Sequence, residues 1–318
     1  MKKVIFVLGI GRSGSTLLDY MLGSHPRCFD LNEISKLPEI HRHRERESTQ
    51  IFWNKEGKYW EQKFTPEELD RLVAGLSNHR LNPLIPLKVE RFFRQLFGAD
   101  YILNPYSQIF DKIDADVLVD SSKYVDWVSK KLNAREFRAG SLQGYLIHLV
   151  RDGRAVLNSY SRVYKDLTVE QFSRRWSTLM RQDEQFFEKF PAERKLLVRY
   201  EALASDPEAT LTQICNMVGL SYDPEMIEYW KHEHYGIVGN FGTRSIIDKY
   251  KGNQTEEKVQ DVHGSYYEKQ GITIRLDLRW KNELPQEKID EFYRLVGDMN
   301  KPYEWDETTE KQVSARAF

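Results

Sequence analysis

The 318-residue sequence predicts an α/β protein with a P-loop-like, three-layer fold, in which helices flank a central parallel sheet. Four short apolar runs have the length and composition of buried parallel strands, and they cover residues 4–8, 117–119, 145–150 and 196–198. Polar residues able to bind a ligand or to begin a helix follow each run. Because ligands bind beyond the carboxyl ends of such strands, these separate segments are expected to converge on one site.

The first predicted strand leads into the loop LGIGRSGSTLL, residues 8–18, which predicts an anion site. A turn that opens a helix offers unpaired backbone N–H groups to an anion. Gly9 and Gly14 have the spacing of a phosphate-binding loop. However, Ser15 stands where a nucleoside triphosphatase has its lysine, and the positive charge lies at Arg12 instead. The loop therefore favours a phosphate-like anion over the β- and γ-phosphates of ATP with Mg²⁺.

The composition excludes several classes of protein. Net charge is −1, whereas a nucleic-acid-binding protein is usually strongly basic. Two cysteines, Cys28 and Cys215, are too few for a disulfide scaffold or a cysteine-rich zinc site, and they indicate reduced thiols in a cytoplasmic protein. No apolar run reaches the 18 residues of a membrane span, and the apolar start is too short for a secretory signal.

The chain is expected to form one domain over residues 1–318, with residues 36–115 inserted as a helical cap that binds the acceptor. This insertion interrupts the alternation of strands and helices. It holds a cluster of basic and acidic residues at 41–47 and an amphipathic helix from about Pro66. Its aromatic residues could line an acceptor site or form the core of the cap itself, and they are Phe52, Trp53, Tyr59, Trp60 and Phe64.

Helix patterns and their start and stop signals predict helices elsewhere, over residues 153–164, 168–189, 207–219 and 286–300. Residues 236–280 are rich in glycine and polar residues, and they predict a long loop or arm.

The third predicted strand gives a second anion-binding signal, LVRDGRAVLNS at residues 149–159. Arg151 lies at the strand end, and Ser159 lies two turns into the next helix, so together they can hold one phosphate. The two loops, in this order, resemble those of sulfotransferases that use 3′-phosphoadenosine 5′-phosphosulfate (PAPS). The resemblance, to the bacterial branch, extends over Val198–Leu203, Asp206–Glu208 and Gly219–Leu220.

The resemblance implies a donor site without a metal, with PAP as the product left after transfer. The first loop would hold the 5′-phosphosulfate through Arg12, Ser13, Gly14, Ser15 and Thr16. Arg151 and Ser159 would hold the 3′-phosphate, which Arg244 could also reach, and Tyr200 would line the adenosine side.

The resemblance also implies the catalytic residues Glu33, Arg12 and Lys123. Glu33 follows Arg12 by 21 residues, the spacing found for the proposed general base in tyrosylprotein sulfotransferases and related bacterial enzymes. Burial near the acceptor is expected to raise the pKa of Glu33. A base could instead come from His232, His234 or His263, whereas His148 falls within an apolar strand and is expected to be a core histidine.

Two other functions remain open at this stage: an ATP-dependent phosphotransferase or nucleotide kinase, and a non-catalytic nucleotide-binding protein of the same fold. The expected partner is a hydroxyl-bearing acceptor rather than a nucleic acid or a membrane. It could be a carbohydrate, a tyrosine, a small-molecule alcohol, or an acyl chain tethered to a carrier protein.

Overall fold

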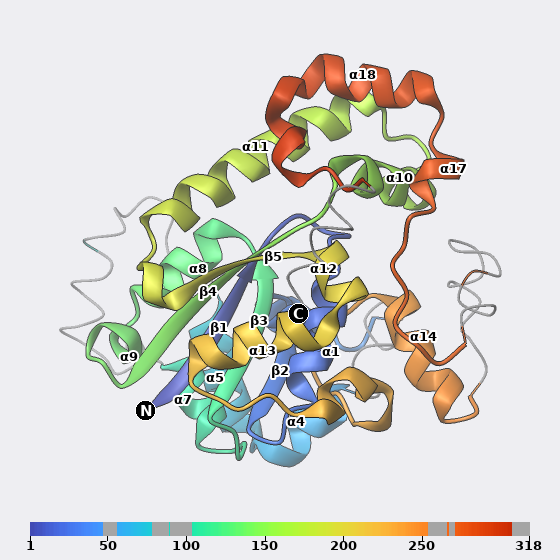
Figure 1. Cartoon of the computed structure of the whole chain (residues 1–318). Coiled ribbons are helices and arrows are strands. Elements are labelled where there is room, and N and C mark those ends of the chain that lie inside the picture. The colour runs from blue at the N-terminus through green and yellow to red at the C-terminus, as the bar shows by residue number, and fades with distance from the viewer. Residues whose placement is uncertain (47–55, 78–88, 90–103, 254–265, 267–270, 307–318) are drawn as a thin grey trace.

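The computed structural model describes residues 1–46, 56–77, 89, 104–253, 266 and 271–306. A five-stranded sheet in the order β2-β3-β1-β4-β5 forms its centre, and every neighbouring pair of strands is parallel. Helices cover the two faces of this sheet (Figure 1). The predicted α/β architecture is therefore confirmed. No helix in the described ranges is both long enough and apolar enough to cross a membrane.

The four predicted strands are confirmed, and they are β1 (Lys2–Leu8), β3 (Val117–Lys123), β4 (Leu142–Val150) and β5 (Lys195–Arg199). The fifth strand, β2 (Cys28–Asn32), lies at the edge of the sheet beside β3 and was not predicted as a strand. Its polar residues Asp30 and Asn32 interrupt the apolar run, although both side chains are buried.

Alternation along the strands divides the core between the two faces. Ile5 and Val7 of β1 pack with α1 (Ser15–Gly23), α12 (Tyr200–Ser205) and α13 (Pro207–Val218). The other β1 side chains, Val4, Phe6 and Leu8, pack on the opposite face with the helices that follow β2 and with α8 (Val125–Leu132).

The described part of the segment between β2 and β3 is helical. Its elements are η1 (Ile34–Lys36), α2 (Leu37–Arg42), α4 (Lys58–Lys63), α5 (Pro66–Leu76) and α7 (Pro105–Phe110). Trp60 and Phe64 are buried in the same hydrophobic cluster as β1, so these two aromatic residues belong to the core. Phe52 and Trp53 lie outside the described residues.

The helices predicted after β4 are confirmed as α10 (Gly153–Val163), α11 (Val169–Lys189), α13 and α18 (Gln286–Val296). Helix α18 is shorter than predicted because Gly297, at φ 58°, ends it and the chain continues as η6 (Gly297–Tyr303). The remaining short elements are α9 (Arg135–Arg138), η4 (Ala192–Arg194) and η5 (Pro224–Lys231).

The prediction that residues 236–280 form one long loop is wrong in part. Helix α14 (Phe241–Tyr250) lies within this range, and α17 (Trp280–Glu283) begins at its end. Asn240 caps α14, because its side-chain oxygen accepts a hydrogen bond of 3.2 Å from the amide of Thr243. One of the polar residues that favoured a loop, Asn240, is thus the N-cap of a helix.

Asp152 is the buried carboxylate that connects the end of β4 to the C-terminal part of the described chain. It caps α10, accepts a hydrogen bond from the side chain of Arg154 at 2.6 Å, and accepts another from the amide of Trp305 at 3.0 Å. Asn300 also donates to it at 3.3 Å. Asp152 and Arg154 therefore hold the loop after β4 in place.

The Asp152→Ala variant should lose about 3 kcal/mol of unfolding free energy, because it leaves the half-buried guanidinium of Arg154 and several buried donors without their partner. Urea denaturation measures this loss. Asp206→Ala is the matched control, since Asp206 caps α13 through one hydrogen bond of 3.1 Å from Ala209 and should cost only about 1 kcal/mol. Equal losses in the two variants would contradict a connecting role for Asp152.

Candidate functional site

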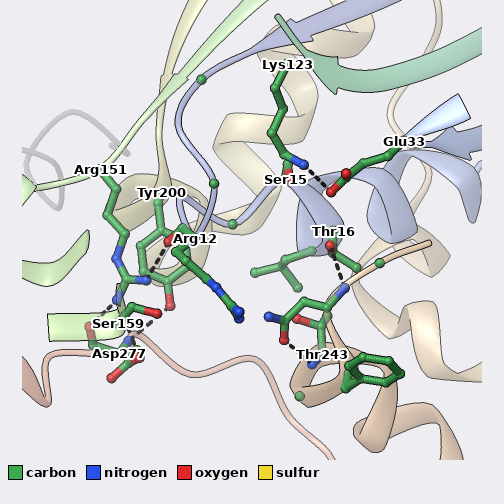
Figure 2. Close-up of a pocket in the computed structure, with 18 of the residues that line it drawn as sticks. Arg12, Ser15, Thr16, Glu33, Lys123, Arg151, Ser159, Tyr200, Thr243 and Asp277 are labelled. Atoms are coloured by element: carbon green, nitrogen blue, oxygen red, sulfur yellow. Dashed lines mark hydrogen bonds and ion pairs between the residues drawn. The ribbon is translucent and has the colours of Figure 1, made fainter. Parts of the chain in front are cut away.

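A cavity of about 390 Å³ lies at the carboxyl ends of the central strands. The loops after β1, β3 and β4 line it, together with residues 239–243 and 274–279 from the late part of the chain. Figure 2 shows that Arg12 extends between two groups of side chains, one around Arg151 and the other around Glu33. The sheet thus brings together residues that are more than 100 positions apart in the sequence.

The loop after β1 has the backbone of an anion-binding turn. Gly14 stands at the N-terminus of α1 with φ 92°, and the first backbone bond of the helix runs from the Leu18 amide to the Gly14 carbonyl at 3.1 Å. The amides that precede Leu18 are therefore directed out of the helix end, where an anion can bind. Arg12 has φ 71°, a left-handed conformation that is uncommon for arginine. Ser13 is buried within the turn, where its amide donates to the Ile10 carbonyl.

A segment from the late part of the chain lies against this loop. The amide of Asn240 donates a hydrogen bond of 3.0 Å to the hydroxyl of Thr16, on the first turn of α1. Gly239 packs so closely there that an added Cβ would lie 3.2 Å from the Thr16 methyl group. Together with Thr243, which Figure 2 shows opposite Arg12, these residues form the wall of the cavity beside the helix N-terminus.

Arg151 joins the loops after β1 and β4. Its guanidinium donates hydrogen bonds of 3.0 Å to the carbonyl of Arg12 and to the carbonyl of Asp277, and it stacks 4.2 Å from the centre of the Tyr200 ring. Burial alone would lower the pKa of Arg151, but Tyr200, Asp277 and Glu201 raise it above its usual value. Arg151 is thus a buried, permanently charged group, and Ser159 of α10 lines the same cavity.

Asp277 is an acidic residue of this site that the sequence did not predict. Its carboxylate lies 2.8 Å from Arg279, 3.4 Å from Arg151 and 3.8 Å from Arg162. Burial would raise its pKa, but the three guanidinium groups more than offset this and hold the pKa well below the usual range. Asp277 is therefore ionised near neutral pH.

Glu33 lies on the other side of the cavity, directly after β2. Its carboxylate accepts a hydrogen bond of 2.5 Å from Lys123 and pairs with Lys36 at 2.7 Å. Burial would raise its pKa, but the two ammonium groups together lower it below the usual value of a glutamate. The expectation of a raised pKa for Glu33 is therefore wrong, because the neighbouring lysines outweigh desolvation.

The cavity is strongly basic although the chain as a whole is nearly neutral. Among the described residues, three acidic ones line it: Glu33, Asp183 and Asp277. Burial raises the pKa of Asp183 to about 8, so this residue contributes little negative charge near neutral pH. In the same described ranges, eight basic residues line the cavity: Arg12, Lys36, Lys123, Arg151, Arg162, Arg175, Arg275 and Arg279. An arrangement of this kind attracts a polyanion.

Arg244 does not meet the prediction that it reaches this site. Its guanidinium pairs with Glu56 at 2.7 Å, and it lines a separate small cavity of about 10 Å³. Helix α14 explains the difference, because the residues before Arg244 line the large cavity while the helix places Arg244 against Glu56.

None of the histidines in the described part of the chain lines the large cavity. His234 is buried, with one ring nitrogen 3.2 Å from Asp30 and the other 2.9 Å from the carbonyl of Tyr229. His232 lies 3.7 Å from Glu225, and His263 lies outside the described residues. His148 is a buried histidine within β4, as predicted, and burial lowers its pKa to about 4.

Within the described ranges, no group of three or more histidine, cysteine, aspartate or glutamate side chains is placed to hold a metal ion.

Three tyrosines, Tyr124, Tyr160 and Tyr164, also line the cavity. The hydroxyl of Tyr160 lies so near Gly11 that a Cβ added to this glycine would lie 3.0 Å from it. The sequence analysis did not identify these tyrosines, because nothing in their local pattern distinguishes them from core residues.

Comparison with solved structures shows the fold. The sulfotransferase domain from the Synechococcus PCC 7002 olefin synthase is similar over 96% of this chain and 95% of that domain, with 20% identity and a TM-score of 0.50. The sulfotransferase domain from the curacin biosynthetic pathway is similar over 92% of this chain and 97% of that domain, with 19% identity and a TM-score of 0.49.

Comparison of sequences shows the family. An uncharacterized protein of Aquifex aeolicus (strain VF5) is 23% identical over 238 residues, which are 72% of this chain but 27% of that protein. The chain thus spans much less than two thirds of the length of this relative. The model of the sulfotransferase family matches residues 4–224, more than half of the chain, and this range includes the loops after β1 and β4. The chain therefore belongs to the sulfotransferase family.

Proposed function

We propose that this sulfotransferase transfers the sulfuryl group of PAPS to the hydroxyl group of an acceptor. The observation that carries the proposal is the meeting of three elements in one basic cavity: the loop at Arg12, the Arg151–Ser159 pair and the Glu33–Lys123 pair. PAPS carries roughly four negative charges near neutral pH. The excess of basic side chains around the cavity matches such a donor without a metal ion.

The two anion-binding elements would hold opposite ends of the donor. The amides at the start of α1, with Arg12, Ser15 and Thr16, suit the 5′-phosphosulfate. Arg151 and Ser159 suit the 3′-phosphate, since a guanidinium and a hydroxyl can bind one phosphate together. The ring of Tyr200 supports the guanidinium of Arg151 and lines the cavity between these two ends.

Glu33 would act as the general base of the transfer. It accepts the proton of the acceptor hydroxyl while the acceptor oxygen forms a bond to sulfur and the bond from sulfur to the phosphate oxygen breaks. PAP leaves with the electron pair of the broken bond. Lys123 and Arg12 would stabilise the charge that develops on the transferred group and on the leaving phosphate.

The ion pair between Glu33 and Lys123 would link the role of Glu33 as the base to the role of Lys123 in binding the donor. With its pKa lowered, Glu33 is ionised and ready to accept a proton, although it is a weak base. A donor phosphate drawn to Lys123 would weaken the pair, and the pKa of Glu33 would then rise toward that of a better base. Residue 33 would thus become more basic when the donor is in place.

We further propose that residues 36–115 bind the acceptor, within one sulfotransferase domain that comprises residues 1–318. Lys36 supports this, because it lines the cavity at the point where the insertion begins. The acceptor remains a hydroxyl-bearing molecule of one of four classes: a carbohydrate, a tyrosine, a small-molecule alcohol, or an acyl chain on a carrier protein.

Calorimetric titration of the chain with PAP, ATP and AMP, with and without Mg²⁺, tests the donor. We expect PAP to bind at micromolar concentration without Mg²⁺, and much more tightly than AMP, which lacks the 3′-phosphate. Tight binding of ATP that requires Mg²⁺ would favour a phosphotransferase. PAP binding with no sulfuryl transfer to any of the four acceptor classes would favour a non-catalytic nucleotide-binding protein.

Arg151→Ala should weaken PAP binding by roughly ten- to 150-fold, because it removes a charge-assisted phosphate contact of about 1.5–3 kcal/mol. The same calorimetric titration measures this change. Arg174→Ala is the matched control, since Arg174 is an exposed arginine of α11 that pairs with Glu170 outside the cavity, and this variant should keep its PAP affinity. Unchanged PAP affinity in Arg151→Ala would remove the loop after β4 from the donor site.

Glu33→Gln should bind PAP almost normally but should lower turnover at least about a hundredfold, the usual contribution of a general base. The readout is initial-rate kinetics with saturating PAPS. Retained turnover would show that another group accepts the proton.

The pH profile of kcat/KM separates Glu33 from a histidine, because it reports the free enzyme. The lysines lower the pKa of Glu33, so its carboxylate stays ionised as the pH falls from 8 to 5. Once the ionisation of the free donor's 3′-phosphate, at about pH 6, is divided out, the profile should therefore show no acidic limb in this range. A limb near the ordinary histidine pKa of about 6.5 would contradict this assignment.

A further inference from the structure

We infer that the carboxylate of Asp277 competes with the 3′-phosphate of the nucleotide for three arginines, and so lowers the affinity for PAP. These arginines, the arginine cluster, are Arg151, Arg162 and Arg279. The inference rests on the proposed function, because it takes Arg151 as the ligand of the 3′-phosphate. It adds a residue that no local sequence pattern marks and that lies beyond the range matched by the family model, which ends at residue 224.

The position of the carboxylate is the first argument. Figure 2 shows Asp277 beside Arg151 and Ser159, the two residues proposed to hold the 3′-phosphate. The carboxylate lies within 4 Å of Arg151, Arg162 and Arg279, all of which line the cavity. A phosphate bound at this point would need the same guanidinium groups that the carboxylate already contacts.

The charge of the cluster is the second argument. Arg162 also pairs with Glu283 at 2.5 Å, so three guanidinium groups and two carboxylates leave a net charge of +1. A phosphate monoester carries about −1.5 to −2 near neutral pH, so the cluster falls short of neutralising it while Asp277 is in place. The Nε atoms of Arg151 and Arg162 are buried and have no hydrogen-bond partner among the described residues, so these arginines keep donors that the carboxylate does not use.

The backbone of Asp277 is held independently of its carboxylate. Its amide donates to the hydroxyl of Tyr200 at 3.2 Å, and its carbonyl accepts from Arg151 at 3.0 Å. Replacing the carboxylate by a neutral group therefore removes charge while these two hydrogen bonds remain. This separates the electrostatic effect of Asp277 from its effect on the position of the segment.

Asp277→Asn should bind PAP at least about fivefold more tightly than the unmodified chain, because one like-charge repulsion near 4 Å is removed. Stopped-flow displacement should show slower release of PAP, and the gap in affinity should narrow as NaCl is raised. Asp277→Ser is a second neutral variant, and it should change the affinity in the same direction.

Asp116→Asn is the matched control, since Asp116 also pairs with two cations, Arg27 and Lys2, but lies outside the cavity. Its PAP affinity should equal that of the unmodified chain. Equal or weaker PAP binding by both Asp277 variants, with normal binding by the unmodified chain, would overturn the inference and make Asp277 a positioning residue. If the unmodified chain itself does not bind PAP, the proposed donor fails, and the inference fails with it.

Discussion

The parallel direction of the central strands is the constraint on which the rest of the site depends. Leu8 of β1 lies level with Lys123 of β3 and with His148 of β4, so the chain leaves all three strands at the same edge. Arg12 and Arg151 then emerge next to each other, and the hydrogen bond between them fixes the two loops. An antiparallel sheet would place the corresponding loops at opposite edges, and no common anion site could form.

Local sequence was sufficient to predict four of the five strands and the two loops that meet at the cavity, because each depends on neighbouring residues and their spacing. It failed where a distant contact decides the outcome. Edge strand β2 gains its burial from β3 and the late segment, despite the polar Asp30 and Asn32. Asp277 could not be predicted as a site residue from local sequence, because only the fold places it beside Arg151. Arg244 was assigned to the site because its sequence position fits, whereas its helix places it against Glu56.

The protein holds many cations around one small cavity, and a few carboxylates each pair with more than one of them. Glu33 bridges Lys36 and Lys123, while Asp277 serves three arginines. A pair of charges 4 Å apart is worth about 1 kcal/mol in water and about 4 kcal/mol at an effective dielectric constant of 20. Few but well-placed anions can therefore offset the repulsion, and they still leave an excess of positive charge for a ligand.

The short parallel bridge between Asn32 and Ile237 also protects the sheet from pairing with other chains. Strand β2 is an edge strand, and an uncovered edge presents free amides and carbonyls to any passing strand. The Ile237 amide donates to Leu31, and the Ile237 carbonyl accepts from Glu33, each at 2.9 Å. Ile237 therefore pairs with the free carbonyl and amide at the carboxyl end of β2. Another chain cannot then add a strand to these groups, a step by which aggregation would compete with folding.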